Sequence, residues 1–440
     1  MRVLVTGAHG FLGSHIAAAL AAAGHQVVAA GRDIAFARRV LPQFEWIACD
    51  FNCDTSADVW LPRLAGVDAV VNSVGVLQAT RRDKLQRIHV DAAVALMKAC
   101  ERADVRRFVQ ISALGIETAD TEYARTKRAG DNALAETSLD WVVVRASLVV
   151  GRGSYGGTAL MRGLAGLPGF IPLMGGGEFH LFQPILMRDF TRAVVGLVER
   201  NAPSRSIVPV AGPTQITLKE LILTLRQWLG FGPARVVAIP GSLFSLAARL
   251  SDALGWIGVP TAFRTTSIEQ MEAGSSVAEG DEPKRLPIDA EPLRDGLFTE
   301  PATVEDRWHA RLYFLKPLLR IALGAYWLGN GLLIGRLVAR ADYVALLSAH
   351  IQESLAAKAS VALATGDLAI QIAVGLCFLL RIWVRPAAIT MLAYLVFLFV
   401  IQSSLALFFY DSVSTVVLNG VRTLLFVASL LVVLAIERER

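Results

Sequence analysis

Valine-rich runs alternate with stretches rich in alanine and leucine up to about residue 270. Short apolar runs bounded by polar residues predict buried strands, and the longer stretches between them predict helices. The predicted strands are Arg2–Thr6, Gln26–Ala30, Trp46–Cys49, Ala69–Asn72, Arg107–Ser112 and Trp141–Arg145. Strands that alternate with helices form a parallel sheet covered on both faces, so we expect residues 1–270 to fold as a doubly wound α/β domain.

The pattern changes twice beyond residue 270. Residues 272–310 contain many acidic, basic and proline residues, so we expect a surface linker over 271–310. From Pro317 the chain is strongly apolar, and between Pro386 and Ile436 its only formal charges are Asp411 and Arg422. Because about 20 apolar residues span a bilayer, residues 311–440 are expected to form a bundle of membrane-spanning helices near 317–335, 359–380, 386–410 and 413–436. A buried all-helical bundle of a soluble protein is the alternative.

Basic residues predict how these four helices cross the membrane. Four lie near the entrance of the first span, Arg307, Arg311, Lys316 and Arg320, and two lie between the second and third spans, Arg381 and Arg385. The positive-inside rule places such segments in the cytoplasm. No apolar segment with a cleavage site opens the sequence, so we expect no secretory signal. We predict a multi-pass protein of the inner (cytoplasmic) membrane, with the N-terminal domain and the C-terminus in the cytoplasm.

One segment between the predicted spans differs from the others. The stretch from Arg336 to Lys358 has apolar positions at three- and four-residue spacing. Such spacing, with basic residues on the other face, predicts a helix that lies in the membrane interface.

Composition favours a membrane partner over nucleic acid. Hydrophobic residues make up 54% of the 440 residues and charged residues 18%, against about 25% charged in typical soluble domains. The net charge is +5, but the sequence contains no run of five basic residues and no basic face interleaved with aromatic residues. We therefore expect no nucleic-acid partner. Cys49 and Cys53 have no second pair or histidine nearby, so we expect no metal site.

A glycine-rich turn, TGAHGFLG at residues 6–13, follows the first predicted strand and opens a predicted helix. In this setting Gly7 allows a tight turn, Gly10 lets the backbone approach a pyrophosphate, and Gly13 lets helix and strand pack closely. The helix N-terminus adds unpaired N–H groups for the phosphates. A purely structural turn is the alternative. We predict dinucleotide binding, with contacts from Thr6, Gly7, His9, Gly10, Phe11, Leu12 and Gly13.

The ends of the next three predicted strands supply further cofactor candidates. Arg32 follows the second strand, where a basic side chain accepts the 2′-phosphate of NADP, whereas Asp33 lies one residue too far along to bind the ribose of NAD. We therefore expect NADP (NADPH), with NAD as the alternative. Asp50 follows the third strand and is placed to meet the adenine. Ser73 and Gly75 follow the fourth strand and place small residues beneath the cofactor.

A candidate catalytic set follows the fifth strand. Tyr123 and Lys127 are four residues apart and hence on one helix face, and Ser112 lies eleven residues before Tyr123 at a strand end. The lysine ammonium and the positive nicotinamide lower the pKa of the tyrosine, whose phenol can then exchange a proton with a substrate hydroxyl or carbonyl. Ser112 would orient the substrate. A solvated helix face is the alternative.

At these residues the chain resembles the short-chain dehydrogenase/reductase superfamily, in its extended or atypical branch, through TGAHGFLG, Asp50, the NSVG segment at 72–75, Ser112 and YARTK at 123–127. It is more closely similar to atypical members related to the NAD(P)H-binding accessory subunit of respiratory complex I, through RASLVVG at 145–151, GGG at 175–177 and QPILMRD at 183–189.

This resemblance covers about residues 1–270. It implies a Rossmann-like doubly wound sheet, a small substrate lobe at about 150–190 and 235–270, and a cofactor that some relatives hold without turnover. Two positions depart from the pattern: Ala146 stands where relatives usually have proline, and His89 stands near the place where many catalytic members have asparagine.

Residues 305–436 resemble the DoxX-like four-helix membrane domain fused behind such reductases, through the segments PATVEDRW at 301–308 and YFLKP at 313–317. Within the predicted spans, Asp367 and Arg422 lie at similar depth, with Gln371, Gln402 and Asn419 near them. Lone charges in hydrocarbon are costly, so we expect Asp367 and Arg422 to pair.

The leading functional hypothesis is a membrane-anchored NADP-dependent oxidoreductase or epimerase that acts on a small, apolar or membrane-associated substrate with Ser112, Tyr123 and Lys127. The second is a non-catalytic NADPH-binding structural or assembly factor for a membrane complex, which implies a membrane protein partner. A third is a redox sensor for transport through the helices. The sequence does not identify the substrate.

Overall fold

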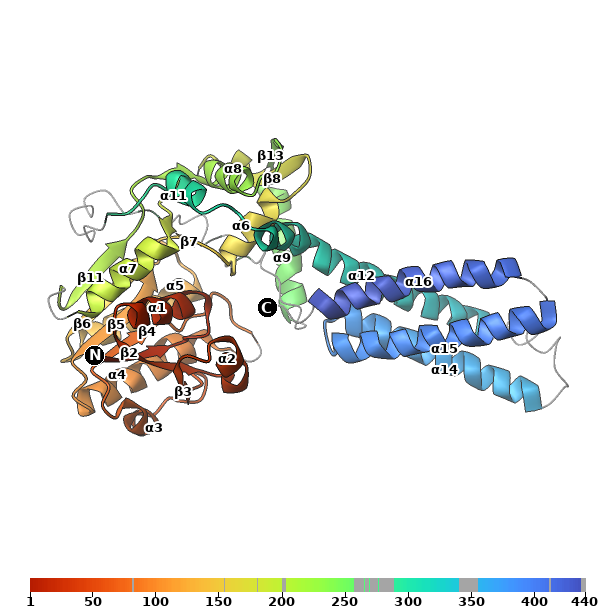
Figure 1. Cartoon of the computed structure of the whole chain (residues 1–440), viewed down its shortest axis with the longest axis horizontal. Helices are drawn as coiled ribbons and strands as arrows, with labels where there is room; N and C mark the ends of the chain where they lie inside the picture. The colour runs from red at the N-terminus through yellow and green to blue at the C-terminus, as the bar shows by residue number, and fades with distance from the viewer. Residues whose placement is uncertain are drawn as a thin grey trace. The chain divides into compact units, whose positions relative to one another are not determined.

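The computed structural model describes residues 1–80, 83–153, 155–179, 181–199, 203–256, 265, 269, 276, 289–339, 355–410 and 413–436. The chain divides into two compact units (Figure 1). Met1–Trp256 with Pro260–Arg311 form the first unit, and Ile257–Val259 with Leu312–Arg440 form the second, which we call the helical unit.

A parallel sheet forms the centre of the first unit. In the described residues it has seven strands in the order β11-β6-β5-β4-β1-β2-β3. The strands are β1 (Arg2–Thr6), β2 (Gln26–Gly31), β3 (Glu45–Ala48), β4 (Ala69–Asn72), β5 (Arg107–Ala113), β6 (Trp141–Ala146) and β11 (Ser206–Val210). The first six match the predicted strands to within one residue at each end. β11 was not predicted, because it contains Pro209, which interrupts a strand pattern; a proline is tolerated there since β11 is an edge strand.

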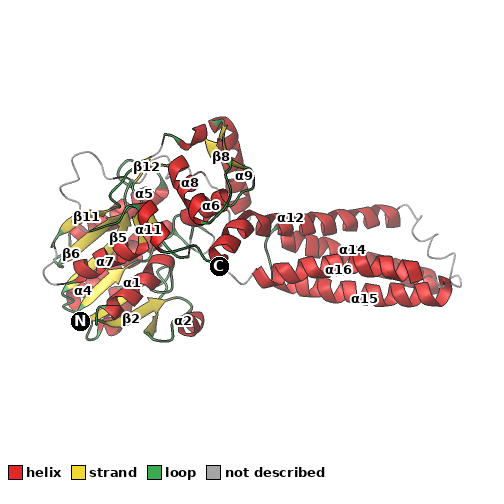
Figure 2. Cartoon of the chain, turned by 45° about the horizontal axis from the view of Figure 1, so that its top comes forward, coloured by secondary structure: helices red, strands yellow, loops and turns green. Residues whose placement is uncertain are grey.

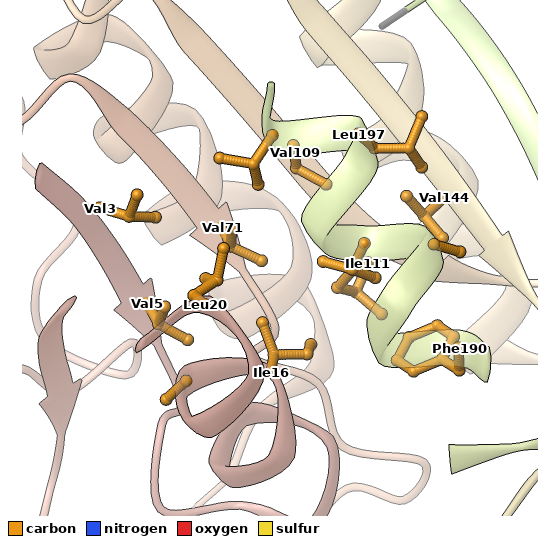
Figure 3. Packing of buried hydrophobic residues seen from close by; sticks show 14 of the residues in the cluster. Val3, Val5, Ile16, Leu20, Val71, Val109, Ile111, Val144, Phe190 and Leu197 are labelled. Carbon is orange, nitrogen blue, oxygen red and sulfur yellow. The ribbon is translucent and has the colours of Figure 1, made fainter. Parts of the chain in front are cut away.

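Successive residues of each strand face opposite sides of the sheet, and each side is covered by helices. On one side, α1 (Phe11–Ala22) and α7 (Met187–Val198) pack Ile16 and Phe190 against strand residues such as Val3 (Figure 3). On the other side, Leu4 belongs to a second core with residues of α3 (Ala57–Trp60), η1 (Leu61–Leu64), α4 (Ala92–Arg102) and α5 (Glu122–Ala135). α2 (Ile34–Val40) follows β2, and η2 (Arg87–Asp91) runs directly into α4. The doubly wound α/β fold is therefore confirmed.

A smaller lobe completes the first unit. Its main elements are α6 (Gly157–Ala165), β8 (Phe170–Met174), η3 (Gly175–Gly177), α8 (Leu218–Trp228), β13 (Arg235–Ile239), α9 (Gly241–Trp256) and α11 (Leu293–Thr299). Three short strand pairs lie beside the main sheet: β7 (Val149–Val150) with β10 (Ile185–Leu186), β9 (Leu181–Phe182) with β12 (Ile216–Thr217), and β8 with β13. A separate hydrophobic core holds the lobe together and includes residues of α8 and α11, which lie outside the predicted lobe at 150–190 and 235–270.

The predicted linker over 271–310 is wrong in its second half. Residues 289–310 contain α11, whose Leu293 and Leu297 are buried in the lobe core, and the first turns of α12 (Val304–Ala339). Charged residues misled the prediction, because some of them are buried in pairs: Arg162 donates to Asp306 at 2.7 Å. Of residues 271–288, all but Ser276 lie outside the described residues.

The described helical unit consists of the end of α12, α14 (Leu355–Leu379), α15 (Val384–Tyr410) and α16 (Val413–Ile436) (Figure 2). Phe378, Ala388, Met391 and Leu430 are in its core. Each helix contains all or nearly all of one predicted span, but among the described residues only Val384–Ile401 and Val416–Ile436 are long and apolar enough to cross a membrane. Four spans therefore stay a prediction. Most of the predicted interface helix, residues 340–354, lies outside the described residues.

The predicted pair of Asp367 and Arg422 does not form among the described ion pairs. Asp367 Oδ1 accepts hydrogen bonds from Gln371 Nε2 at 2.5 Å and from the Tyr394 hydroxyl. Arg422 Nη2 instead donates to the Tyr326 hydroxyl at 3.0 Å. Neutral side chains thus satisfy both charged residues. The side chains of Gln402 and Asn419, which we also expected here, lie outside what the structure describes.

Candidate functional site

The glycine turn has the geometry that a phosphate site requires. Gly7 has a φ of +68° directly after β1, and the Gly10 N–H donates to the Gly7 carbonyl at 2.8 Å. A Cβ at Gly13 would lie 2.2 Å from the Gly7 oxygen, so no side chain fits there. α1 then begins at Phe11 with Gly10 as its N-cap and no side-chain cap. Its first N–H groups are available to an anion.

The other predicted residues of this turn pack around it. The His9 ring lies against Gly31, where a Cβ would be 2.3 Å from Nδ1, and edge-on to Trp46 at 6.4 Å. Phe11 and Leu12 are partly buried against the core beneath α1. His9 therefore covers the end of β2 rather than the phosphate turn alone.

Thr6 and Ser73 hold strand ends together. The buried Thr6 hydroxyl donates to Asn72 Oδ1 at 2.6 Å, and Asn72 Nδ2 donates to Gln110 Oε1 at 2.9 Å. Ser73 Oγ donates to the Thr6 carbonyl at 2.6 Å. The hydroxyl groups of Thr6 and Ser73, both predicted to bind the cofactor, therefore already donate hydrogen bonds within the protein. The sequence did not indicate these bonds.

The end of β2 carries an ion pair that sequence reasoning missed. Arg32 Nη1 lies 2.6 Å from Asp83 Oδ1, which also accepts from Asn52 Nδ2 at 3.0 Å. Asp50 Oδ1 accepts from the Asn52 backbone N–H at 3.0 Å. Asp33 caps α2 by accepting from the Phe36 N–H at 2.9 Å. The predicted 2′-phosphate ligand therefore has an acidic competitor 51 residues away in the sequence.

One face of α5 carries the predicted catalytic pair. Thr121 caps the helix by accepting from the Ala124 N–H at 3.0 Å, which places Tyr123 in the first turn. Lys127, one turn later, is 5% exposed and donates to the Ile111 carbonyl at 3.0 Å. A Cβ at Gly75 would lie 3.1 Å from Lys127 Nζ, so the structure brings these two predicted residues together.

Burial shifts the titration of this pair in opposite directions. Contrary to the lowering expected from the lysine charge, burial raises the pKa of Tyr123 to about 12, and the negative charge of Asp131 adds to the increase. Burial lowers the pKa of Lys127, although Asp131 opposes that shift. At neutral pH the phenol therefore carries its proton, as an acid that protonates a carbonyl oxygen must.

His89 is a buried neutral side chain beside Tyr123. Burial and then the charge of Lys127 lower its pKa to about 2. Its Nε2 accepts from the Val76 N–H at 3.2 Å, so Nδ1 carries the proton and donates to Thr126 Oγ1 at 2.8 Å. The ring is edge-on to Tyr123 at 5.6 Å. This histidine ties the loop after β4 to α5, and it lies on a π-helical turn, a feature often found at functional sites.

Asp131 is the site residue that sequence reasoning missed. It is 2% exposed, and its Oδ2 accepts from Ser112 Oγ at 2.7 Å. Burial raises its pKa to about 6, while the bond from Ser112 and the charge of Lys127 act in the opposite direction. Asp131 lies four residues after Lys127, so extending the helix face of Tyr123 and Lys127 by one turn would have found it.

Comparison with known proteins identifies this unit. A family model described as NAD(P)H-binding matches residues 7–162. The photosystem II assembly factor Ycf39 of a Synechocystis strain is 25% identical over 54% of this chain and 71% of its own length. Subunit 9 of the NADH dehydrogenase 1 alpha subcomplex from Arabidopsis thaliana is 26% identical over 54% of this chain, which spans only 62% of that subunit.

The 3-diazoavenalumate denitrifying reductase of a Streptomyces species is 30% identical over 58% of this chain and 88% of its own length. Among solved structures, that of gox2253 is 19% identical over 70% of this chain and 99% of that chain, with a TM-score of 0.52, which shows the shared fold. These findings confirm the predicted cofactor class, NAD(P)H, and the relation to the complex I subunit. The family model lies within the first unit, so the DoxX-like assignment of residues 305–436 stays a prediction.

Proposed function

The chain belongs, through its first unit, to the NAD(P)H-binding family of the Streptomyces reductase, and on this premise we propose that it is an NAD(P)-dependent oxidoreductase or epimerase. The observation that carries the proposal is the buried face of α5, on which Tyr123 and Lys127 lie in successive turns, with Lys127 next to Gly75. This face adjoins the carboxyl end of β5, where ligands bind in open parallel sheets.

Each residue of the set has a role in this reaction. Tyr123 gives a proton to the carbonyl oxygen of the substrate or takes one from its hydroxyl. Lys127 holds a positive charge beside the phenol, and Ser112 hydrogen bonds to the substrate oxygen. A bound dinucleotide supplies or accepts the hydride.

We propose NADP as the preferred cofactor. Arg32 is the basic group at the end of β2, and a guanidinium binds phosphate well. Its ion pair with Asp83 must open to admit a 2′-phosphate, whereas the 2′-hydroxyl of NAD would leave the pair intact. NAD therefore remains the alternative.

We further propose that the helical unit anchors the enzyme in the inner membrane as a DoxX-like domain with four spans, and that the substrate is apolar or membrane-associated. Large apolar side chains on the outside of α15 and α16 support this proposal, because each is more than half exposed: Ile389, Phe397, Val400, Leu418, Leu424 and Leu425. A lipid bilayer would cover them.

The second candidate is a non-catalytic NADPH-binding factor that supports a membrane complex. The specific observation in its favour is the likeness to an assembly factor and to a subunit of a respiratory complex.

The two candidates differ in whether the bound cofactor reacts. The full chain is purified in detergent, its bound nucleotide is identified, and NADPH oxidation is followed with carbonyl lipids, quinones and nucleotide sugars. An enzyme loses NADPH oxidation in Tyr123→Phe. A structural factor retains NADPH that no compound oxidises, and Tyr123→Phe leaves it unchanged.

A further inference from the structure

The serine that the proposed reaction assigns to the substrate already has a partner. Ser112 Oγ donates to Asp131 Oδ2 at 2.7 Å, and both residues are buried, with 5% and 2% of their surfaces exposed. A hydroxyl has one proton to donate and two lone pairs that accept. While Asp131 is ionised, Ser112 can therefore only accept from a substrate.

Charged groups face Asp131 from every element packed around it. Lys127 and Tyr123 lie on its own helix, and Arg145 Nε lies 3.9 Å from Oδ2 at the end of β6. Glu117, on the segment after β5, pairs with Arg145 and weakens the effect of that cation. The other carboxylate oxygen, Oδ1, is buried and has no hydrogen-bond partner among the residues that the structure describes. Such a carboxylate is poorly stabilised in its ionised form, which favours binding a proton.

We propose that Asp131 is a positioning residue whose protonation reverses the Ser112 hydrogen bond and so selects the substrate oxygen that Ser112 binds. The inference rests on the proposed oxidoreductase function. With Asp131 ionised, Ser112 donates to Oδ2 and accepts from a substrate alcohol. With Asp131 protonated, Oδ2–H donates to Ser112, and the freed Oγ–H donates to a substrate carbonyl.

No proton leaves Asp131 in this step. In the reduction of a carbonyl, the carbon receives the hydride and the oxygen receives the proton of Tyr123, while Asp131 keeps its own proton. Asp131 therefore acts through Ser112 alone. The shift of its pKa to about 6 places the reversal within the range of cellular pH.

The first test needs no substrate. Infrared spectra of the full chain, with aspartate labelled with ¹³C at its carboxyl carbon, are recorded between pH 4 and 8 for wild type, Asp131→Asn and Ser112→Ala. We expect a carboxyl band that titrates near pH 6, is absent in Asp131→Asn, and moves to higher pH in Ser112→Ala, since that variant lacks the donor that stabilises the carboxylate. An unchanged midpoint in Ser112→Ala, or no Asp131 band, overturns the inference.

The second test measures the NADPH-dependent reduction of 9,10-phenanthrenequinone. The protonated fraction of a group with a pKa near 6 falls about tenfold from pH 5 to 7, so kcat should fall about tenfold more in wild type than in Asp131→Asn. Asp58→Asn, in an exposed pair with Arg102, is the control and should follow wild type. Equal pH profiles for wild type and Asp131→Asn contradict the inference. A protein that binds no dinucleotide contradicts the proposed function instead, and the infrared titration still decides the role of Asp131.

Discussion

Asp131 in the first unit is buried and Asp367 in the helical unit is partly buried, each on a helix, and the neighbours of the two carboxylates differ. Asp131 has one hydroxyl donor, one unpartnered oxygen, and the charges of Lys127 and Arg145 nearby. Asp367 accepts from two neutral donors, Gln371 and Tyr394. Asp131 therefore has one hydrogen-bond donor and charged neighbours, whereas Asp367 has two neutral donors.

The hydrogen-bond network around Asp367 also joins helices. Asn330 Nδ2 on α12 donates to Gln371 Oε1 at 2.6 Å, Gln371 shares α14 with Asp367, and Tyr394 comes from α15. Each member has a partner, and a fully satisfied buried network makes packing specific. We infer that burial alone does not identify a reactive carboxylate. A reactive carboxylate is identified instead by an oxygen without a hydrogen-bond partner and by nearby charges, as at Asp131.

The largest expected effect is on turnover at the proposed catalytic site, which contains Tyr123. Tyr123→Phe should lower kcat about a hundredfold or more, because general acid catalysis contributes about 10²–10⁴-fold, and it should leave NADPH affinity within a few fold. Steady-state turnover and fluorescence titration measure the two quantities. Tyr155→Phe, an exposed tyrosine of the same unit, serves as control. Turnover that survives in Tyr123→Phe would assign the chemistry to another group.

The hydrogen-bond network around Asp367 should stabilise the helical unit. Asp367→Ala leaves Gln371 and Tyr394 without their acceptor, and each unsatisfied group costs about 1–3 kcal/mol, so we expect a loss of roughly 2–6 kcal/mol in the free energy of unfolding. Because Arg422 has a different partner, the loss in the double variant with Arg422→Ala should equal the sum of the single losses. Unfolding in detergent measures both losses, with Ser429→Ala, at a half-buried serine outside this network, as control. A double variant much more stable than that sum would restore the direct pair.

His89 extends the comparison of Asp131 with Asp367 to a histidine, because burial and the charge of Lys127 keep its side chain neutral. Its pKa is about 2 in the folded chain against an ordinary 6.5, so its contribution to stability is present above pH 6.5 and is lost as the pH falls. Acidification from pH 7 to 5 should cost about 2 kcal/mol through this residue. Urea unfolding at both pH values measures the loss, which should disappear in His89→Gln and persist in His25→Gln. The same pH dependence in His89→Gln as in wild type would contradict the assignment.

The smallest expected effect tests the ion pair at the end of β2. A charge-assisted hydrogen bond contributes about 1.5–3 kcal/mol, so Arg32→Ala should weaken NADPH binding about tenfold or more. Asp83→Asn should strengthen NADPH binding, since it releases Arg32, and both variants should leave NADH nearly unchanged. Calorimetric titration of both cofactors decides. Equal changes for NADPH and NADH would remove Arg32 from the 2′-phosphate site.

Local patterns predicted the sheet and the glycine turn well, because period and composition act within a few residues. β1 and the turn at Gly7 are examples. Contacts distant in sequence were not predictable in this way: Asp83 meets Arg32 only after the loop following β4 folds back. Likewise, the charged segment that contains Asp306 looked like a linker because the partner of Asp306, Arg162, lies 144 residues away in the sequence.

The site was predicted in part for the same reason. Tyr123 and Lys127 share a helix face that spacing reveals, and Gly75 does lie beside Lys127. Ser112 was assigned to the substrate because the sequence does not show that a carboxylate one turn beyond Lys127 takes its proton. The charges of Asp367 and Arg422 predicted a pair, but neutral side chains on neighbouring helices satisfy both.

Hydride transfer by the purified full chain tests the central claim most directly. The protein is loaded with NADPH carrying deuterium at both C4 positions and mixed with carbonyl lipids, quinones and nucleotide sugars, and the products are analysed by mass spectrometry. We predict deuterium in one product formed by wild type and none with Tyr123→Phe. Bound NADPH that keeps its deuterium with every compound, in wild type as in Tyr123→Phe, would contradict an enzymatic role and favour a structural one.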